Sequence, residues 1–277
     1  LMARMADLIG KPVDAAEYRT LAEHIRKAFL ARFYDPLKKT FGSQTANSLA
    51  LYLGLAPSGD GDAVAAAIAD DVVRVNGGHL TTGVTGSRHL YHALSGHGYG
   101  DTALGIFRKT DYPSIGHLFN LGATTLWESW TDNGSSKNHP MQGSFGVWFY
   151  DGIGGINPYP DKPGYKHTIL RPLVVGCLDH ADVSRTTPFG TVSSNWTFRD
   201  GVFTWRVSIP ANTTATVHVP ADGPDAATEG GFPVGKAEGL TMKGFEKGYL
   251  ALEAGSGTYT FVSRVDAEKW AIARGRK

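Results

Sequence analysis

A proline-rich stretch at residues 158–164, with the sequence PYPDKPG, divides the chain into two parts with different apolar patterns. Before it, apolar residues recur at the spacing of amphipathic helices. After it, apolar and polar residues alternate, which is the period of a half-buried strand. This change predicts an α+β protein with a helical part at residues 1–157, a β part at 158–265 and a C-terminal tail at 266–277.

The helical part is expected to consist of helices joined by short loops rich in Gly, Pro, Ser and Asp. In residues 15–33 an apolar stripe lies opposite a charged side, so this helix needs a partner. The apolar repeat is already running at Leu1 without an N-cap, which predicts a chain that starts inside a domain. The expected helices cover residues 1–9, 15–33, 43 or 44 to 53, 61–76, 87–94, 99–108, 114–120 and 143–152, and the stripe of the second comprises Tyr18, Leu21, Ile25, Ala28, Phe29 and Phe33.

The β part begins its clearest alternation at Phe203, where apolar residues at 203, 205, 207 and 209 alternate with polar ones. Residues 191–198 form a second such run, and Arg199-Asp200-Gly201 supplies a hairpin turn between the two. Further short runs at 215–219, 250–252 and 258–262 complete a small all-β domain. The pattern predicts an antiparallel β-sandwich.

Composition excludes several functional classes. With 27 basic and 26 acidic side chains, the formal net charge of +1 offers no electrostatic footprint for nucleic acid or an anionic membrane. Cys177 is the only cysteine, so an intrachain disulfide is impossible. The ten His residues include no pair at zinc-site spacing with a carboxylate, and the glycines of residues 152–155 do not follow a strand as a phosphate loop would. We therefore expect no metal and no other cofactor.

The most informative short segment is residues 122–132, GATTLWESWTD, in which Glu128 lies between Trp127 and Trp130 and Asp132 follows. Indole faces suit the C–H faces of a sugar ring, and a carboxylate beside them can orient hydroxyls, activate water or protonate a leaving oxygen. These residue types together favour carbohydrate chemistry. The alternative is that the two Trp residues, three positions apart, share one face of a helix and belong to the core.

Several segments, in this order along the chain, resemble the bacterial α-L-rhamnosidases of glycoside hydrolase family 78. The resemblance spans nearly the whole chain. Its segments are GGHLTTG at 77–83, TDYPS at 110–114, GATTLWESW at 122–130, the pair Asn138-His139 before GSFGVW at 143–148, PGYKHTILRP at 163–172 and IPANTTATV at 209–217.

The resemblance implies a partial (α/α)6 barrel, matched over about its second half, followed by a β-sandwich. In the family the Glu of the TTLWE segment is the general base that activates water in an inverting reaction, which assigns that role to Glu128. The general acid belongs to an upstream Arg-Asp-Glu type segment, and residues 1–110 contain no such segment. The acid is therefore expected to precede Leu1.

The remaining candidate site residues are substrate-binding ones. The family's Asn-His pair places its His in the sugar subsite, which implies that His139 binds a sugar hydroxyl. Trp127 either flanks the base or packs behind it, and Trp130 either lines the cleft or belongs to the core. Asp132 orients Glu128 or a hydroxyl, or it caps the turn before Asn133-Gly134. His79 is expected to face the cleft, whereas His117, His167 and His180 are expected to be structural.

The resemblance and these residues together predict an inverting glycosidase that removes terminal α-L-rhamnosyl groups from a rhamnose-containing oligosaccharide or glycoside. Two alternatives stay open. One is a carbohydrate-binding or scaffold fragment without the acid, and the other is a half-barrel that needs a separate N-terminal chain. Half a ring of helical hairpins leaves apolar faces uncovered, which favours self-association or such a partner. Neither a nucleic acid nor a membrane is an expected partner, and the compartment, cytoplasmic or periplasmic and secreted, is left open.

Overall fold

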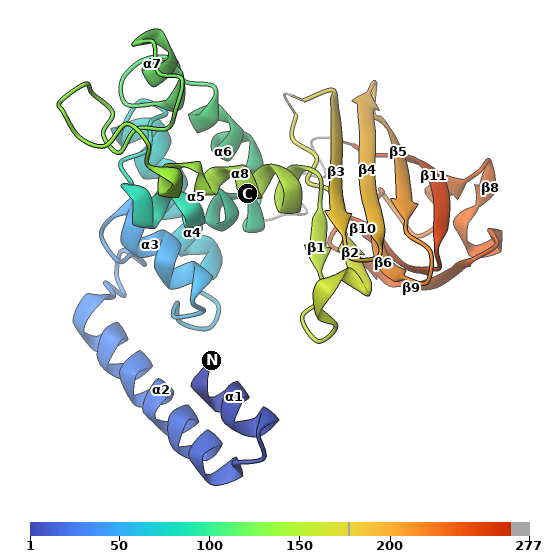
Figure 1. Cartoon of the computed structure of the whole chain (residues 1–277), viewed down its shortest axis with the longest axis horizontal. Helices are drawn as coiled ribbons and strands as arrows, with labels where there is room; N and C mark the ends of the chain where they lie inside the picture. The colour runs from blue at the N-terminus through green and yellow to red at the C-terminus, as the bar shows by residue number, and fades with distance from the viewer. Residues whose placement is uncertain (177, 267–277) are drawn as a thin grey trace.

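In the computed structural model, which describes residues 1–176 and 178–266, a helical part is followed by two β-sheets (Figure 1). This confirms the predicted fold class. Cys177 and all but Asp266 of the predicted tail at 266–277 lie outside the described residues. None of the described helices has the length and apolar character needed to cross a membrane.

The helices occur where the apolar pattern predicted them, with boundaries that differ by a few residues. Ser43 and Ser114 act as N-caps, because their hydroxyls accept hydrogen bonds from the backbone N–H groups of Ala46 and His117 at 3.1 and 2.9 Å. The helices are α1 (Met2–Leu8), α2 (Pro12–Phe33), α3 (Gln44–Tyr52), α4 (Gly61–Asp70), the π-helix η1 (Asp71–Val75), α5 (Val84–Gly96), α6 (Gly100–Phe107), α7 (Ile115–Asn120), the 3-10 helix η2 (Pro140–Phe145), α8 (Gly146–Trp148) and the π-helix η3 (Phe149–Ile153).

Two expectations about helices need correction. The helix expected at 143–152 consists of three short pieces, η2, α8 and η3, in a segment where glycine, a poor helix former, occurs at 143, 146 and 152. Residues 122–132 contain no helix, so the helical alternative for Trp127 and Trp130 is wrong. Gly122 follows α7 with a left-handed φ of 84°, which turns the chain out of the helix.

The β part is a sandwich of a five-stranded sheet, in the order β1-β2-β6-β10-β9, and a six-stranded sheet, in the order β3-β4-β5-β11-β7-β8. All strand pairs are antiparallel except β2 with β6. The strands are β1 (Ile156–Pro158), β2 (His167–Leu170), β3 (His180–Thr187), β4 (Gly190–Arg199), β5 (Val202–Ile209), β6 (Thr214–Pro220), β7 (Ala227–Glu229), β8 (Phe232–Pro233), β9 (Leu240–Glu246), β10 (Tyr249–Ala254) and β11 (Gly257–Arg264), with short 3-10 turns η4 (Pro163–Tyr165) and η5 (Val234–Lys236).

The alternation that predicted β5 marks the core of the sandwich. Phe203, Trp205 and Val207 are completely buried. The indole N–H of Trp205 donates to the Ser194 hydroxyl at 2.9 Å, so the largest core side chain leaves no unsatisfied polar atom. The Trp205 and Phe261 rings pack with their centroids 5.8 Å apart.

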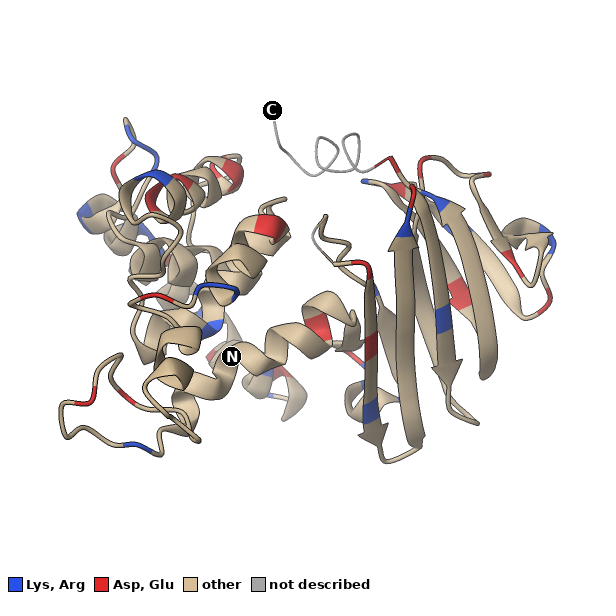
Figure 2. Ribbon diagram, turned by 90° about the horizontal axis from the view of Figure 1, so that it is seen from above, with Lys and Arg blue, Asp and Glu red and all other residues tan. Residues whose placement is uncertain are grey.

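The helical part passes directly into the sandwich, and the two lie side by side (Figure 2). The last helix, η3, ends at Ile153, and β1 begins at Ile156. The Trp196 indole donates to the Ile153 carbonyl at 3.0 Å, and one continuous core includes buried residues of both parts. β1 also spans the domain boundary predicted between residues 157 and 158, and that division stays a prediction.

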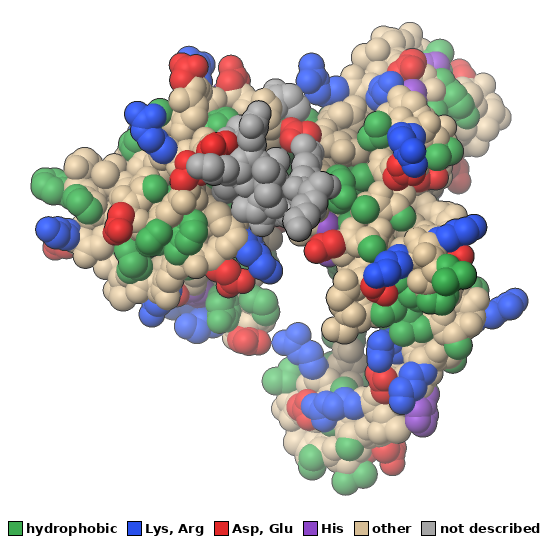
Figure 3. All heavy atoms as spheres, turned by 180° about the vertical axis from the view of Figure 1, so that it is seen from behind, with side chains coloured by type: hydrophobic (Ala, Val, Ile, Leu, Met, Phe, Trp, Pro, Cys, Tyr) green, Lys and Arg blue, Asp and Glu red, His purple; other side chains and the backbone are tan. Residues whose placement is uncertain are grey.

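The hairpin of α1 and α2 projects from the rest of the molecule (Figure 1). The C-terminal end of α2 is anchored, because Phe29 stacks on Phe41 with their ring centroids 5.5 Å apart. Hydrophobic side chains are exposed on the hairpin (Figure 3). We call the following set the hairpin apolar face: Met2, Met5, Leu8, Ile9, Val13, Tyr18, Leu21, Ile25 and Phe33.

Candidate active site

The residues singled out around Glu128 lie in one long loop between α7 and η2, which we call the Glu128 loop (residues 125–139). Its two limbs are held together by backbone hydrogen bonds. The N–H of Glu128 donates to the Ser136 carbonyl at 2.9 Å, and the N–H of His139 donates to the Leu126 carbonyl at 2.8 Å. The loop therefore places Glu128 and His139 on facing limbs, although they are separated in sequence.

Glu128 combines a fixed backbone with a free side chain. Its carbonyl accepts a hydrogen bond at 3.3 Å from the Gln142 side chain, which is buried in η2. Its carboxylate is exposed and has no hydrogen bond or ion pair with any residue in the described part of the chain. A carboxylate in this state has its oxygens available for water or for a sugar hydroxyl.

His139 precedes η2 and is half-buried. Its backbone is hydrogen-bonded on both sides, because its carbonyl also accepts from the Gln142 N–H at 3.0 Å. Neither ring nitrogen has a hydrogen-bond partner among residues 1–176 and 178–266. The imidazole is thus positioned by its backbone and can still donate or accept a hydrogen bond.

The two Trp residues of the loop are both partly or wholly packed. Trp127 is 6% exposed, and the Lys137 ammonium lies 4.6 Å from the centroid of its ring. Trp130 is half-buried against the main core. Asp132 forms an ion pair with Lys137 at 2.9 Å. Lys137 therefore connects Asp132 with Trp127 and stabilises the tip of the loop.

His79 lies in a different loop, ahead of α5. Its Nδ1 is 3.0 Å from the Asn76 carbonyl, and its Nε2 is 3.0 Å from a carboxylate oxygen of Asp111. The neighbouring imidazole holds the pKa of Asp111 below its usual range. No hydrogen bond or ion pair joins His79 to the Glu128 loop in the described residues, and its contacts connect two other loops.

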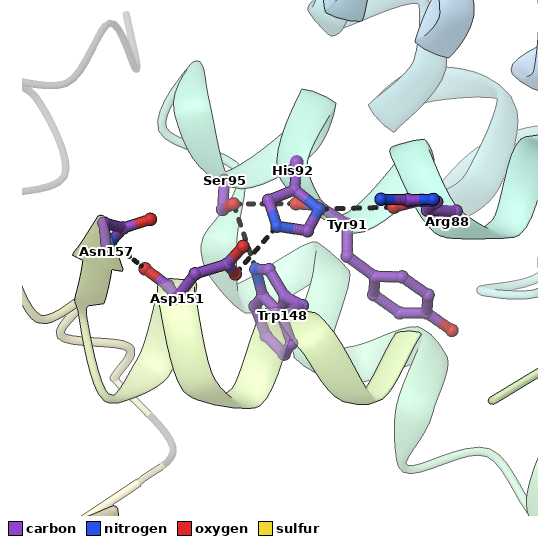
Figure 4. A network of polar contacts seen from close by, with 7 residues as sticks. All are labelled: Arg88, Tyr91, His92, Ser95, Trp148, Asp151 and Asn157. Atoms are coloured by element: carbon purple, nitrogen blue, oxygen red, sulfur yellow. Dashed lines mark hydrogen bonds and ion pairs between the residues drawn. The ribbon is translucent and has the colours of Figure 1, made fainter. Parts of the chain in front are cut away.

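A polar network between α5 and η3 was not anticipated from the sequence (Figure 4). His92 Nε2 lies 2.8 Å from a carboxylate oxygen of Asp151, and His92 Nδ1 lies 3.2 Å from the Arg88 carbonyl. The Trp148 indole donates to Ser95, and the Asn157 side chain donates to the Asp151 carbonyl. His92 and Asp151 lie 59 positions apart in the sequence. The apolar periodicity of each helix does not show which helices pack together, so it could not pair these two residues.

The charge of His92 follows from its partners. Burial alone would lower the pKa of His92, but the hydrogen bond to Asp151 and the charge of that carboxylate outweigh it and raise the pKa. Since the pKa in the folded protein exceeds the ordinary value of about 6.5, the ion pair stabilises the fold below that pH. The stabilisation is lost as pH rises through the pKa of the folded state.

We expect Asp151→Asn to lower the pKa of His92, because an amide NH₂ group donates to the neutral imidazole where the carboxylate favoured the imidazolium. An NMR titration of the His92 ring measures this directly. In the same variant, the fall in the free energy of unfolding between pH 6 and pH 8 should become smaller than in the parent protein. Asp179→Asn, beside the exposed His180, is the matched control. An unchanged titration of His92 would contradict the assignment of the ion pair.

The described residues contain no cluster of three or more His, Cys, Asp or Glu side chains that could hold a metal ion. The Glu128 loop itself presents one free carboxylate and one imidazole with free ring nitrogens, with hydroxyl and amide groups nearby.

Two family models match the chain, one after the other. Residues 1–153 match the bacterial alpha-L-rhamnosidase 6 hairpin glycosidase domain, and residues 155–231 match the bacterial alpha-L-rhamnosidase C-terminal domain. Among curated proteins, an alpha-L-rhamnosidase of Streptomyces avermitilis is 35% identical over 275 residues, which is 94% of this chain and 25% of that protein. One of Formosa agariphila is 34% identical over 208 residues, which is 73% of this chain and 22% of that protein.

Solved structures agree with these matches. The alpha-L-rhamnosidase of Dictyoglumus thermophilum superposes with a TM-score of 0.84 at 34% identity and covers 95% of this chain and 30% of its own. The Streptomyces avermitilis alpha-L-rhamnosidase, solved in complex with L-rhamnose, superposes with a TM-score of 0.83 at 33% identity over 95% of this chain and 25% of its own. The chain thus spans about a quarter of the length of the relatives that it matches.

Proposed function

Because this chain belongs to the bacterial alpha-L-rhamnosidase family, we propose that it forms one side of the catalytic site of an enzyme that removes terminal α-L-rhamnosyl groups. Glu128 is the general base. It takes a proton from a water molecule as that water attacks the anomeric carbon, and the configuration of that carbon is inverted. The substrate is a rhamnose-containing oligosaccharide or glycoside.

The observation that carries this proposal is the unpaired carboxylate of Glu128 on an anchored backbone. A general base must hold its position and keep an oxygen free for the water molecule. Inverting glycosidases hold their two carboxyl groups roughly 6.5–9.5 Å apart to leave room for that water. Asp132, the other carboxylate of the loop, is engaged by Lys137. We therefore assign the general acid to an Arg-Asp-Glu segment outside this chain.

The hairpin apolar face supports the same proposal, in which this chain supplies the general base and another segment supplies the general acid. Its side chains include Leu8 at 86% and Ile9 at 70% exposure, and many exposed hydrophobic side chains on one projecting element favour an interface. We propose that it packs against further helices of the six-hairpin barrel, supplied by an upstream region or by a separate chain. These helices bring the general acid to the opposite side of the cleft.

Release of an aryl alcohol from an aryl α-L-rhamnoside tests the proposal. The chain alone should show almost no turnover, and turnover should appear when it is expressed with an upstream helical half that carries the Arg-Asp-Glu segment. NMR should detect β-L-rhamnose as the first product, because inversion converts the α anomer of the substrate. Full activity of the chain alone would overturn the assignment of the acid. Inactivity of the completed protein would favour a carbohydrate-binding or scaffold fragment instead.

In the completed enzyme, His139→Ala should raise KM for the aryl rhamnoside about tenfold, since a lost hydrogen bond of about 1 to 1.5 kcal/mol corresponds to that factor. The expected cause is loss of a contact between the imidazole and a sugar hydroxyl. Steady-state kinetics measure the effect, and His180→Ala, at an exposed position of β3, serves as the control. Equal KM values for the two variants would remove His139 from the sugar site.

A further inference from the structure

A polar pocket lies on the sandwich, formed by residues that the catalytic proposal does not use. It has a volume of about 340 Å³. Val217 and Val219 of β6 are completely buried, so His218 between them points away from the sandwich core. The pocket is therefore on the outer face of the five-stranded sheet. The lining residues used below are Arg171, His218, Lys243, Glu246, Lys247 and Tyr249.

Arg171, which follows β2, is held in place without an ion pair. The guanidinium carbon of Arg171 lies 4.5 Å from the centroid of the Tyr249 ring, and the backbone N–H of Arg171 donates to the Gly155 carbonyl at 2.8 Å. The Tyr249 hydroxyl donates to the Pro172 carbonyl at 3.1 Å, which fixes the ring itself. No carboxylate of the described residues forms an ion pair with Arg171. Its planar set of N–H donors is therefore ordered and available to an oxyanion.

The charges around Arg171 have one predominant sign. Lys243 of β9 and Lys247 in the turn after it add two cationic side chains, whereas Glu246 is the one carboxylate that lines the pocket. Glu246 lies 3.8 Å from Lys247 and compensates part of that charge. Arg171 and Lys243 thus have no compensating ion pair among the described residues. An anionic group would be attracted to this site.

His218 adds a hydrogen-bonding group to this pocket. Burial and the charge of Arg171 lower the pKa of His218 to about 4, despite the opposing charge of Glu253 on β10. The imidazole is therefore neutral at pH 7 and provides one donor and one acceptor. Neither of its nitrogens has a hydrogen-bond partner in the described part of the chain.

Another histidine on the same sheet face shows the contrast. The two ring nitrogens of His167 lie 2.6 and 2.8 Å from the hydroxyls of Thr214 and Thr216. Thr216 in turn donates to Glu253 at 2.8 Å. The polar side chains around His167 are thus hydrogen-bonded to one another. Arg171 and His218, by contrast, have no hydrogen bond or ion pair with another side chain of the described residues.

We propose that this pocket binds the oxyanion of an acidic saccharide, with the guanidinium of Arg171 as the main contact and Lys243 as a second. The volume fits the lower range of ligand pockets, about 300 to 1,000 Å³, and suits one sugar unit. The oxyanion follows from the charges of the pocket, whereas the saccharide part rests on the proposed function. Such a site would hold an acidic unit of a rhamnose-containing chain at a distance from the hydrolytic loop.

Titration calorimetry with glucuronate tests the proposal, with neutral glucose as the matched ligand and with inorganic sulfate and phosphate as further arms. Glucuronate should bind and glucose should not. Arg171→Gln should weaken glucuronate binding at least tenfold, and Lys243→Gln, on the exposed strand β9, about threefold. Lys236→Gln, in η5 outside the pocket, should change nothing. Glucuronate binding should also raise the pKa of His218 in an NMR titration, because a nearby anion favours the imidazolium.

The outcomes separate the parts of the proposal. Glucose binding as tightly as glucuronate, or glucuronate binding unchanged in both the Arg171 and the Lys243 variant, would overturn it. Sulfate binding as tightly as glucuronate would support the oxyanion site and overturn its assignment to a saccharide. Because none of these measurements requires hydrolysis, failure of this site and failure of the catalytic proposal are distinguishable.

Discussion

Replacing Glu128 by Gln in the completed enzyme should lower kcat by about 10²- to 10⁴-fold, the usual contribution of a positioned general base. The amide has nearly the same size as the carboxylate but cannot accept the proton of the attacking water. The backbone anchors of the loop, the hydrogen bonds to Ser136 and from Gln142, do not involve the replaced side chain. The loop should therefore keep its conformation.

The variant should retain its affinity for L-rhamnose, since substrate binding does not require the proton transfer. Kinetics with an aryl α-L-rhamnoside and calorimetry with L-rhamnose measure the two effects separately. Glu238→Gln, the same change at an exposed position before β9, is the control and should behave like the parent. A Glu128→Gln enzyme with the kcat of its parent would falsify the assignment of the base.

Replacing Gly155 by Ala should give the largest loss of stability among the substitutions considered. Gly155 has a left-handed φ of 68° at the junction of the helical part and the sandwich. A Cβ atom there would overlap the carbonyl group of Arg171 and the nitrogen of Pro172, which are backbone atoms and cannot rotate away. Backbone strain of about 1 to 3 kcal/mol and overpacking of similar size together suggest about 2 to 6 kcal/mol.

Differential scanning calorimetry should show this as a fall in Tm of roughly 10 °C, given that each kcal/mol shifts a protein of this size by about 2 to 4 °C. Gly223→Ala is the control, because that glycine has no left-handed φ and nothing within 4 Å of the added Cβ. A Tm within a degree or two of the parent would mean that the junction relaxes around the methyl group. Such a result would contradict the expected clash with the backbone of Arg171 and Pro172.

The helices and strands that could be predicted are those with a periodic apolar pattern in their own residues. The stripe of α2 and the alternation of β5 are local patterns, and the structure confirms these elements. The strands β1, β2, β3, β7, β8 and β9 were not predicted. β9 illustrates the reason, because all its residues after Leu240 are exposed and an edge strand without a buried face has no alternation to detect.

For the candidate site, the sequence identified the segment but not its conformation. The pairing of Glu128 with Ser136 and of Leu126 with His139 depends on a loop closure between residues that have no common periodicity. The contact of the Lys137 ammonium group with the Trp127 ring could not be predicted, because side-chain contacts across an irregular loop follow no sequence repeat. The roles of Glu128 and His139 as base and sugar ligand stay predictions, as do those of Trp127, Trp130, Asp132 and His79.

The parallel pairing of β2 with β6 has a consequence for synthesis on the ribosome. β1 and β2 are the first strands after the helical part, but β6, the second partner of β2, begins only at Thr214. Until β6 has been translated, one edge of β2 exposes unpaired backbone groups. Translation therefore delays completion of the junction, and the nascent protein is most exposed to aggregation in that interval.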